Sequence, residues 1–201
     1  MSKFLGPIHF LVYNKIQIQQ DLVKKILALN GDLIPNLGEE LDLRYGVSEM
    51  RPLEEVIDGG NIHGWLQSNV SQVEYKLAFS VKSLIEKDPH ILNKIESIFM
   101  EEGKAISVGI TNAPEAYKII SDSLLDGMPC DHANTVIEEN DDKVVWRRNN
   151  CIHKNYWEEV GIDISIYYSL REAFLKGFLM DTTLVYEKAD SVTNMIRRET
   201  K

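Results

Sequence analysis

The chain has 201 residues, of which 44% are hydrophobic, a content that excludes a disordered chain and fits one globular domain. Its formal net charge of −9 disfavours binding to nucleic acid or to anionic lipid, because both are negatively charged. Two cysteines exclude a disulfide-rich scaffold, and no segment approaches the roughly 18 apolar residues of a membrane span, so we expect a cytoplasmic protein.

The first half of the chain shows the 3.6-residue hydrophobic period of amphipathic helices. The spacing predicts four helices, over about residues 8–29, 62–85, 89–99 and 116–125. Between the first two, residues 31–60 carry proline and glycine at several positions and predict an irregular segment with short helical turns, for example over 53–57. The N-terminal part, about residues 1–127, is therefore expected to be helical.

After residue 130 the hydrophobic period changes from 3.6 to two, which predicts a β-hairpin over about 130–153. The two strands are expected over about 133–138 and 143–148, and the residues between them have the composition of a tight turn. Within that turn we expect Asn140-Asp141 to form the two-residue loop.

The pairing register of this hairpin decides where four chemically versatile side chains point. These side chains are Cys130, His132, Cys151 and His153. With Asn140-Asp141 as the loop, Glu138 lies opposite Lys143 and all four side chains share one face. A register shifted by two residues also keeps them together, whereas a shift by one residue separates them. We therefore expect the hairpin to bring the two Cys-x-His pairs close together.

The hairpin is followed by a predicted helix over about 164–180 and a short strand over 182–187. The last ten residues, 192–201, are charged and are expected to fray. This order predicts an α+β fold in a single domain of residues 1–201. The helical N-terminal half would pack on a small antiparallel sheet, built around the hairpin in a hairpin–helix–strand part of about residues 128–190.

Two Cys-x-His pairs on one face could serve several kinds of chemistry. Two thiolates and two imidazoles suit tetrahedral zinc, with Cys130, His132, Cys151 and His153 as ligands. The same geometry suits a cysteine nucleophile with a histidine base. A disulfide is disfavoured in the cytoplasm, and a cysteine on a strand is often only a small buried side chain. We expect no cofactor, with zinc as the alternative.

A second set of residues lies on the predicted helix 62–85, where His63 and Glu74 share one face. Together with His9 and either Glu54 or Glu55 they could form a metal site in a helix bundle. Such sites usually contain Glu-x-x-His pairs, and the sequence has none. We therefore interpret His63 as a polar residue at the start of the helix.

One stretch of the chain resembles a known family. The residues that carry the resemblance are Val145-Trp146-Arg147-Arg148-Asn149-Asn150-Cys151, Trp157, Glu158-Glu159-Val160-Gly161 and Ile166-Tyr167. Over about residues 100–187 they look like the L-2-amino-thiazoline-4-carboxylate hydrolase family. The resemblance implies a hairpin that ends in cysteine, a short helix with W-x-x-x-G, and hydrolytic opening of a thiazoline ring to a carbamoyl-cysteine. Cys151 matches a family cysteine, whereas Tyr168 replaces a second cysteine and Glu172 replaces an aspartate, so the substrate is not transferred.

These features predict a small-molecule hydrolase that acts on a C–N bond. Cys151 would be the nucleophile or acid–base thiol, His132 or His153 would activate it, and Glu172 would orient the base or the attacking water. The candidate substrate-binding residues are Trp157, Tyr167 and Arg171.

The alternative is a non-catalytic small-molecule-binding or accessory protein with an aromatic pocket. The aromatic residues that would line it are Trp65, Tyr75, Trp146, Trp157, Tyr167 and Tyr168. Under both interpretations the expected partner is a small molecule, without nucleic acid or membrane, and assembly into a homo-oligomer stays open.

Overall fold

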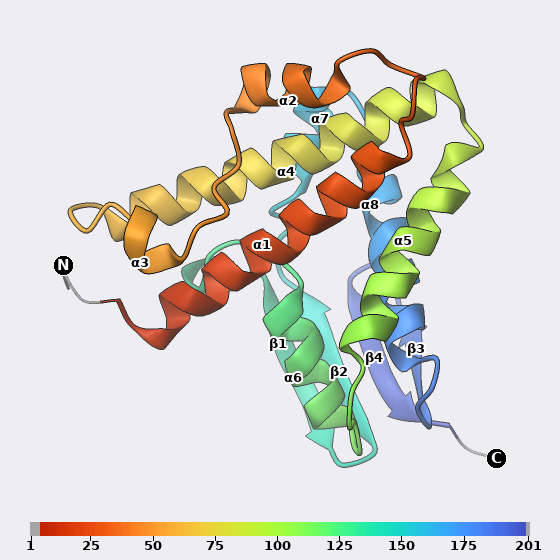
Figure 1. Cartoon of the computed structure of the whole chain (residues 1–201). Coiled ribbons are helices and arrows are strands. Elements are labelled where there is room, and N and C mark those ends of the chain that lie inside the picture. The colour runs from red at the N-terminus through yellow and green to blue at the C-terminus, as the bar shows by residue number, and fades with distance from the viewer. Residues whose placement is uncertain (1–4, 200–201) are drawn as a thin grey trace.

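The structure of the protein is a computed structural model that describes residues 5–199 (Figure 1). The helices are α1 (Pro7–Ala28), α2 (Leu37–Tyr45), α3 (Leu53–Val56), α4 (Ile62–Lys87), α5 (Ile91–Ile106), α6 (Ala113–Ser123), α7 (Lys154–Val160) and α8 (Ile164–Leu179). The strands are β1 (Asn134–Asn140), β2 (Lys143–Arg148), β3 (Leu184–Lys188) and β4 (Thr193–Arg198). They form one antiparallel sheet in the order β1-β2-β4-β3, which confirms the predicted α+β fold.

The helices predicted from hydrophobic spacing are confirmed, and polar residues explain where several of them begin. The Asn61 side chain accepts a hydrogen bond from the Gly64 N–H at the start of α4. Asn112 and Asp163 cap α6 and α8 in the same way. These side chains satisfy N–H groups that the first turn of a helix leaves without a partner. The short turn expected around residue 53 is α3.

Two segments are more ordered than the sequence indicates. Within the segment expected to be irregular, α2 packs on α4 and buries Leu37 and Leu41, which lie on one face of the helix. The prediction that residues 192–201 fray is wrong for residues 192–199. Residues 200 and 201 lie outside the described range. Within residues 192–199, β4 pairs with both β2 and β3 and buries Ile196.

The hairpin of β1 and β2 is confirmed, but its register differs from the first expectation. The loop is Asp141-Asp142 rather than Asn140-Asp141. A β-bulge between Val136 and Glu138 then shifts the rest of the ladder by one residue. This shift leads to the register that separates the two Cys-x-His pairs, and both strands end before reaching them.

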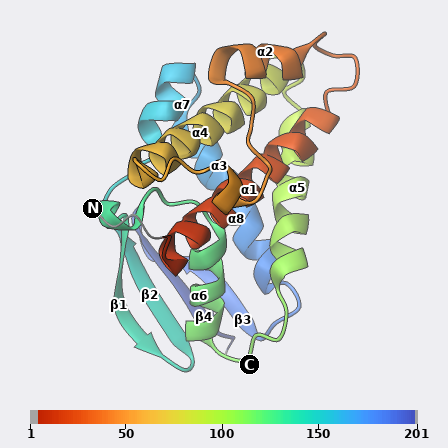
Figure 2. The same cartoon turned by 60° about the vertical axis from the view of Figure 1, so that its left-hand side comes forward.

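Helix packing places the sheet against one end of the helical layer (Figure 1). α1 packs along α4, and α5 packs along α8. The second contact is close, since a Cβ atom at Gly177 would lie 1.9 Å from the backbone oxygen of Met100. α6 lies against β1, β2 and β4, and α8 contacts β3 (Figure 2). Among the helices of residues 5–199, none is long and apolar enough to cross a membrane.

Candidate functional site

A pocket of about 420 Å³ lies between α8 and the sheet. Aromatic rings line part of it, namely Trp146, Tyr168 and Tyr186. Amides and charged groups line the rest, chiefly Asn134, Asn150, Asn194, Asp126, Arg148, His153, Arg171, Glu172 and Lys188. A concave lining that mixes rings with a few polar groups is typical of a small-molecule site.

His153 lies at the inner side of this pocket and is held by two acidic residues. Its Nδ1 is 3.0 Å from Oε2 of Glu74, and its Nε2 is 3.4 Å from Oδ1 of Asp126. Glu74 is fully buried on α4, where its other oxygen accepts a hydrogen bond of 3.0 Å from the Gln19 side chain of α1. The packing of α1 on α4 therefore fixes the carboxylate that orients His153.

Asp126 links His153 to Arg171 on α8. The guanidinium donates two hydrogen bonds to the carboxylate, of 2.8 and 2.7 Å, and Asn134 donates a third of 3.0 Å. The ring of Tyr167 stacks on the His153 imidazole with centroids 4.0 Å apart, and its hydroxyl accepts from Arg171. We call this set the buried polar network: Gln19, Glu74, Asp126, Asn134, His153, Tyr167 and Arg171.

The charges of the buried polar network stabilise one another. Burial alone would lower the pKa of His153, but the carboxylates of Glu74 and Asp126 outweigh burial and raise this pKa to about 9. Burial would raise the pKa of Asp126, but Arg171 and His153 hold it well below its usual range. At neutral pH His153 is therefore a cation whose two N–H groups face carboxylates, so it is not available as a base.

Arg148 is a further cation of the pocket and is arranged differently from Arg171. Its guanidinium lies 4.0 Å from the centre of the Tyr168 ring and donates to the Ser191 carbonyl oxygen. Lys188 and Arg171 each have a carboxylate partner. In the described part of the chain, no carboxylate oxygen lies within 4.0 Å of the Arg148 nitrogens.

The predicted convergence of the two Cys-x-His pairs is wrong. Cys130 is exposed in a 3₁₀ turn (Pro129–Asp131), and His132 after it has a φ of 46°. The prediction assumed an extended strand, in which the side chains of residues 130 and 132 point to the same face. The left-handed backbone of His132 breaks that extended conformation. His153 turns inward to Glu74 instead. Within residues 5–199, no group of three or more His, Cys, Asp or Glu side chains is placed to hold a metal ion.

The helix-bundle metal site sketched around His63 does not form either. The His63 ring packs edge-to-face on the ring of His9, with centroids 5.6 Å apart. Glu74, which was expected on the same face, is instead bonded to His153 and Gln19. Glu74 is therefore part of the pocket rather than of a site at the start of α4.

Cys151, the residue that matches the family cysteine, does not line the pocket itself but contacts Tyr168, which does. It is half-buried, and the Tyr168 hydroxyl donates a hydrogen bond of 3.0 Å to its sulfur. Burial, and then this bond, raise the pKa of Tyr168, so the hydroxyl stays protonated. Neither nitrogen of His153 is directed to Cys151, because both are bonded to carboxylates.

The other predicted site residues have different surroundings. Glu172 lines the pocket but is held in ion pairs with Lys188 and Lys176. Trp157 is fully buried on α7, against Tyr167 in the core. Arg171, a candidate binding residue, lines the pocket, and its guanidinium forms an ion pair with Asp126.

Sequence analysis does not identify Asp126, Asn134 or Arg148 as site residues. Asp126 stands in a loop after α6, beside Gly127, where an acidic residue is commonplace. Asn134 begins β1, and Arg148 belongs to the stretch that resembles the hydrolase family. No protein-family model, curated protein or solved structure was found to match this chain.

Proposed function

We propose that the protein binds a small organic anion with a planar ring in the pocket between α8 and the sheet. The observation that supports this most is Arg148, a half-buried cation that lines the pocket and has no carboxylate partner among the described residues. A buried or half-buried charge without a counter-charge is costly, and an anionic ligand would relieve that cost. Arginine is also well suited to carboxylate groups, because its planar fork can donate two parallel hydrogen bonds.

The remaining lining supports a ring as the rest of the ligand. Trp146 and Tyr186 lie side by side with ring centroids 6.2 Å apart, and Tyr168 stacks with Arg148. Aromatic walls favour stacking with a planar group. Asn150 and Asn194 add amide groups that can bond to polar substituents on the ring.

The test is binding of small aromatic carboxylates such as benzoate and nicotinate, measured by calorimetry and by the rise of melting temperature. Arg148→Met is expected to weaken binding about tenfold to a hundredfold, because it removes charge-assisted hydrogen bonds worth roughly 1.5–3 kcal/mol.

Arg147→Met is the matched control for this experiment. Arg147 is the preceding residue of β2, exposed and directed to the opposite face of the sheet. This variant is expected to bind the carboxylates like the unaltered protein. Equal affinity in the Arg148→Met variant, or binding of the uncharged benzamide as strong as that of benzoate, would contradict the proposal.

A second proposal is hydrolysis of a C–N bond, of the amino-thiazoline-carboxylate hydrolase type, with Cys151 as the reacting thiol. It is favoured by the hydrogen bond from Tyr168 to Cys151, because Tyr168 also lines the pocket and would bring the thiol and the ligand together. Tyr168 would supply a hydroxyl donor at the position where the family has a second cysteine. The activating roles predicted for His132 and His153 have no support in this geometry.

The reactivity of Cys151 tests this second proposal, with Cys130 as an internal control. Cys130 is exposed, whereas Cys151 is half-buried, so exposure alone predicts faster alkylation of Cys130. If Cys151 is the reacting thiol, iodoacetamide at neutral pH is expected to modify Cys151 first, and a Tyr168→Phe substitution is expected to remove this preference. Faster modification of Cys130 in the unaltered protein argues against a reactive Cys151.

A further inference from the structure

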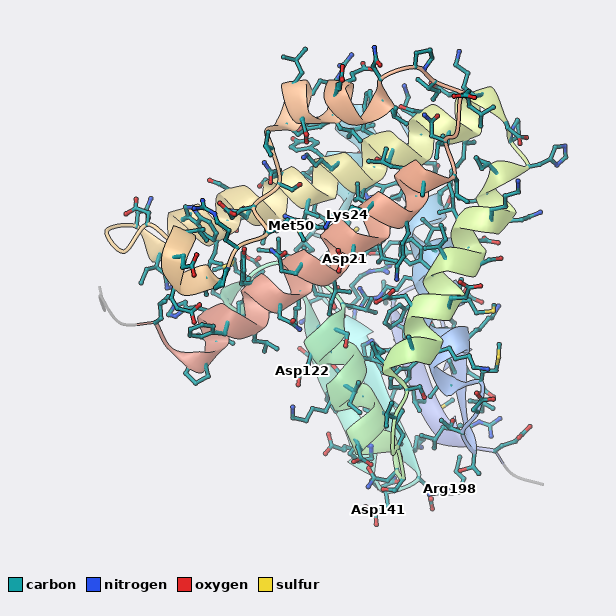
Figure 3. The ribbon with its side chains drawn as sticks, viewed as in Figure 1. Asp21, Lys24, Met50, Asp122, Asp141 and Arg198 are labelled. Carbon is teal, nitrogen blue, oxygen red and sulfur yellow. The ribbon has the colours of Figure 1, made fainter. Side chains whose placement is uncertain are left out.

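A second cavity, of about 270 Å³, lies on the other side of Asp126 and Asn134 from the pocket. α1, the end of α6 and the start of β1 enclose it, and Asp122 of α6 (labelled in Figure 3) lines one side. Because Asn134 donates a hydrogen bond to Asp126, these two side chains form a wall that the two spaces share. The cavity therefore adjoins the pocket and has a lining of its own on the side of α1.

Lys15 of α1 lines this cavity and is unusual among the lysines. The other lysines of residues 5–199 that are not exposed, Lys76, Lys82 and Lys143, each have a carboxylate partner. Within the same range Lys15 has no carboxylate oxygen within 4.0 Å, and its Nζ donates no hydrogen bond. Its amine is half-buried beside open space.

The two carboxylates that line the cavity with Lys15 form ion pairs with other cations. Asp126 is bonded to Arg171, and Asp122 pairs with Lys118. Burial lowers the pKa of Lys15, and the opposing effect of Asp126 and Asp122 does not outweigh it. More of this amine is therefore neutral at a given pH than of an ordinary surface lysine, and the neutral amine is the nucleophilic form.

We propose that Lys15 is a nucleophilic amine that forms an imine with a small aldehyde or ketone bound in this cavity. The neutral Nζ attacks the carbonyl carbon and forms a C–N bond, and the carbonyl oxygen leaves as water with the two amine hydrogens. The hydroxyls of Tyr117 and Ser121 line the same space and can donate to the carbonyl oxygen. Leu11 and Met128 provide apolar surface for the carbon chain.

The experiment is reductive trapping of the folded protein with butyraldehyde and cyanoborohydride at neutral pH, followed by peptide mapping. Lys87 and Lys94 are the internal controls, because both are exposed and neither has a carboxylate within 4.0 Å in the described range. Lys15 is expected to be alkylated faster than both, by up to about tenfold for each unit by which burial lowers its pKa.

Two further measurements test whether the faster labelling of Lys15 depends on the folded cavity or is ordinary lysine reactivity. In urea-unfolded protein the preference for Lys15 is expected to disappear, because the cavity no longer exists. A Lys15→Arg variant, which keeps the positive charge on α1, is expected to lose this adduct while labelling of Lys87 and Lys94 continues. Labelling of Lys15 no faster than that of Lys87 and Lys94 in the folded protein would overturn the proposal, as would a preference that persists in urea.

Discussion

Replacing Arg171 with methionine is expected to lower the free energy of unfolding by about 3 kcal/mol, because the substitution leaves the Asp126 carboxylate without its guanidinium. Losses of roughly 3–5 kcal/mol are usual when one partner of a buried ion pair is removed, and the lower value applies because both side chains line a pocket. Urea unfolding monitored by circular dichroism gives the difference directly.

Lys24→Met is the matched control, since it removes a cation from an exposed ion pair with Asp21 on α1 (Figure 3). It is expected to cost no more than about 0.5 kcal/mol. The Asp126→Asn, Arg171→Met double variant is expected to be more stable than Arg171→Met alone, because the uncompensated charge is gone. An equal loss of free energy of unfolding in Arg171→Met and Lys24→Met would show that the buried ion pair stabilises the fold no more than an exposed one.

The second large effect is a loss of stability at alkaline pH. The pKa of His153 is about 9 in the folded protein, against about 6.5 for an unperturbed histidine. A raised pKa means that the folded state holds the proton more tightly, so this contribution is complete below about pH 6.5 and is lost as the pH rises through 9. We expect the free energy of unfolding to fall by about 3 kcal/mol over this interval through His153.

Glu74→Gln tests the source of this pH dependence. Glu74 is the main partner that opposes burial at His153, so the fall in stability between pH 6.5 and 9 is expected to shrink in this variant. Comparing each variant with itself at two pH values removes the general cost of the substitution. His90→Gln, at an exposed position before α5, is the control and is expected to keep the full fall. An equal fall in the Glu74→Gln variant would exclude this ion pair as the cause.

The helices could be predicted from the sequence because their signals are local. The apolar period of α4 is continuous, and Asn61 marks its start. The features that were predicted wrongly depend on pairing between strands. The bulge in β1 depends on which residues it meets in β2, and β4 depends on two partner strands. A charged segment such as β4 has no local reason to be extended, since the burial of Ile196 arises only in the assembled sheet.

The site was predicted less well, because its contacts join distant parts of the chain. Glu74 and His153 are 79 residues apart, and Asp126 and Arg171 are 45 residues apart. The members of each Cys-x-His pair are neighbours in sequence, but the bulge in β1 and the left-handed backbone of His132 arise only in the fold, and they remove the register and the extended conformation that would bring the two pairs together. His153, Arg171 and Glu172, which are candidate site residues from the sequence, line one pocket, whereas Asp126, which joins two of them, had no sequence signal.

The strand order β1-β2-β4-β3 has a consequence for the nascent polypeptide. As the chain leaves the ribosome, the β1–β2 hairpin emerges first, and the strand that covers the second edge of β2 is translated only after α7, α8 and β3. Until then β2 offers unpaired backbone groups to neighbouring nascent chains. In the interval between the synthesis of β2 and that of β4, this edge is therefore open to pairing with other chains.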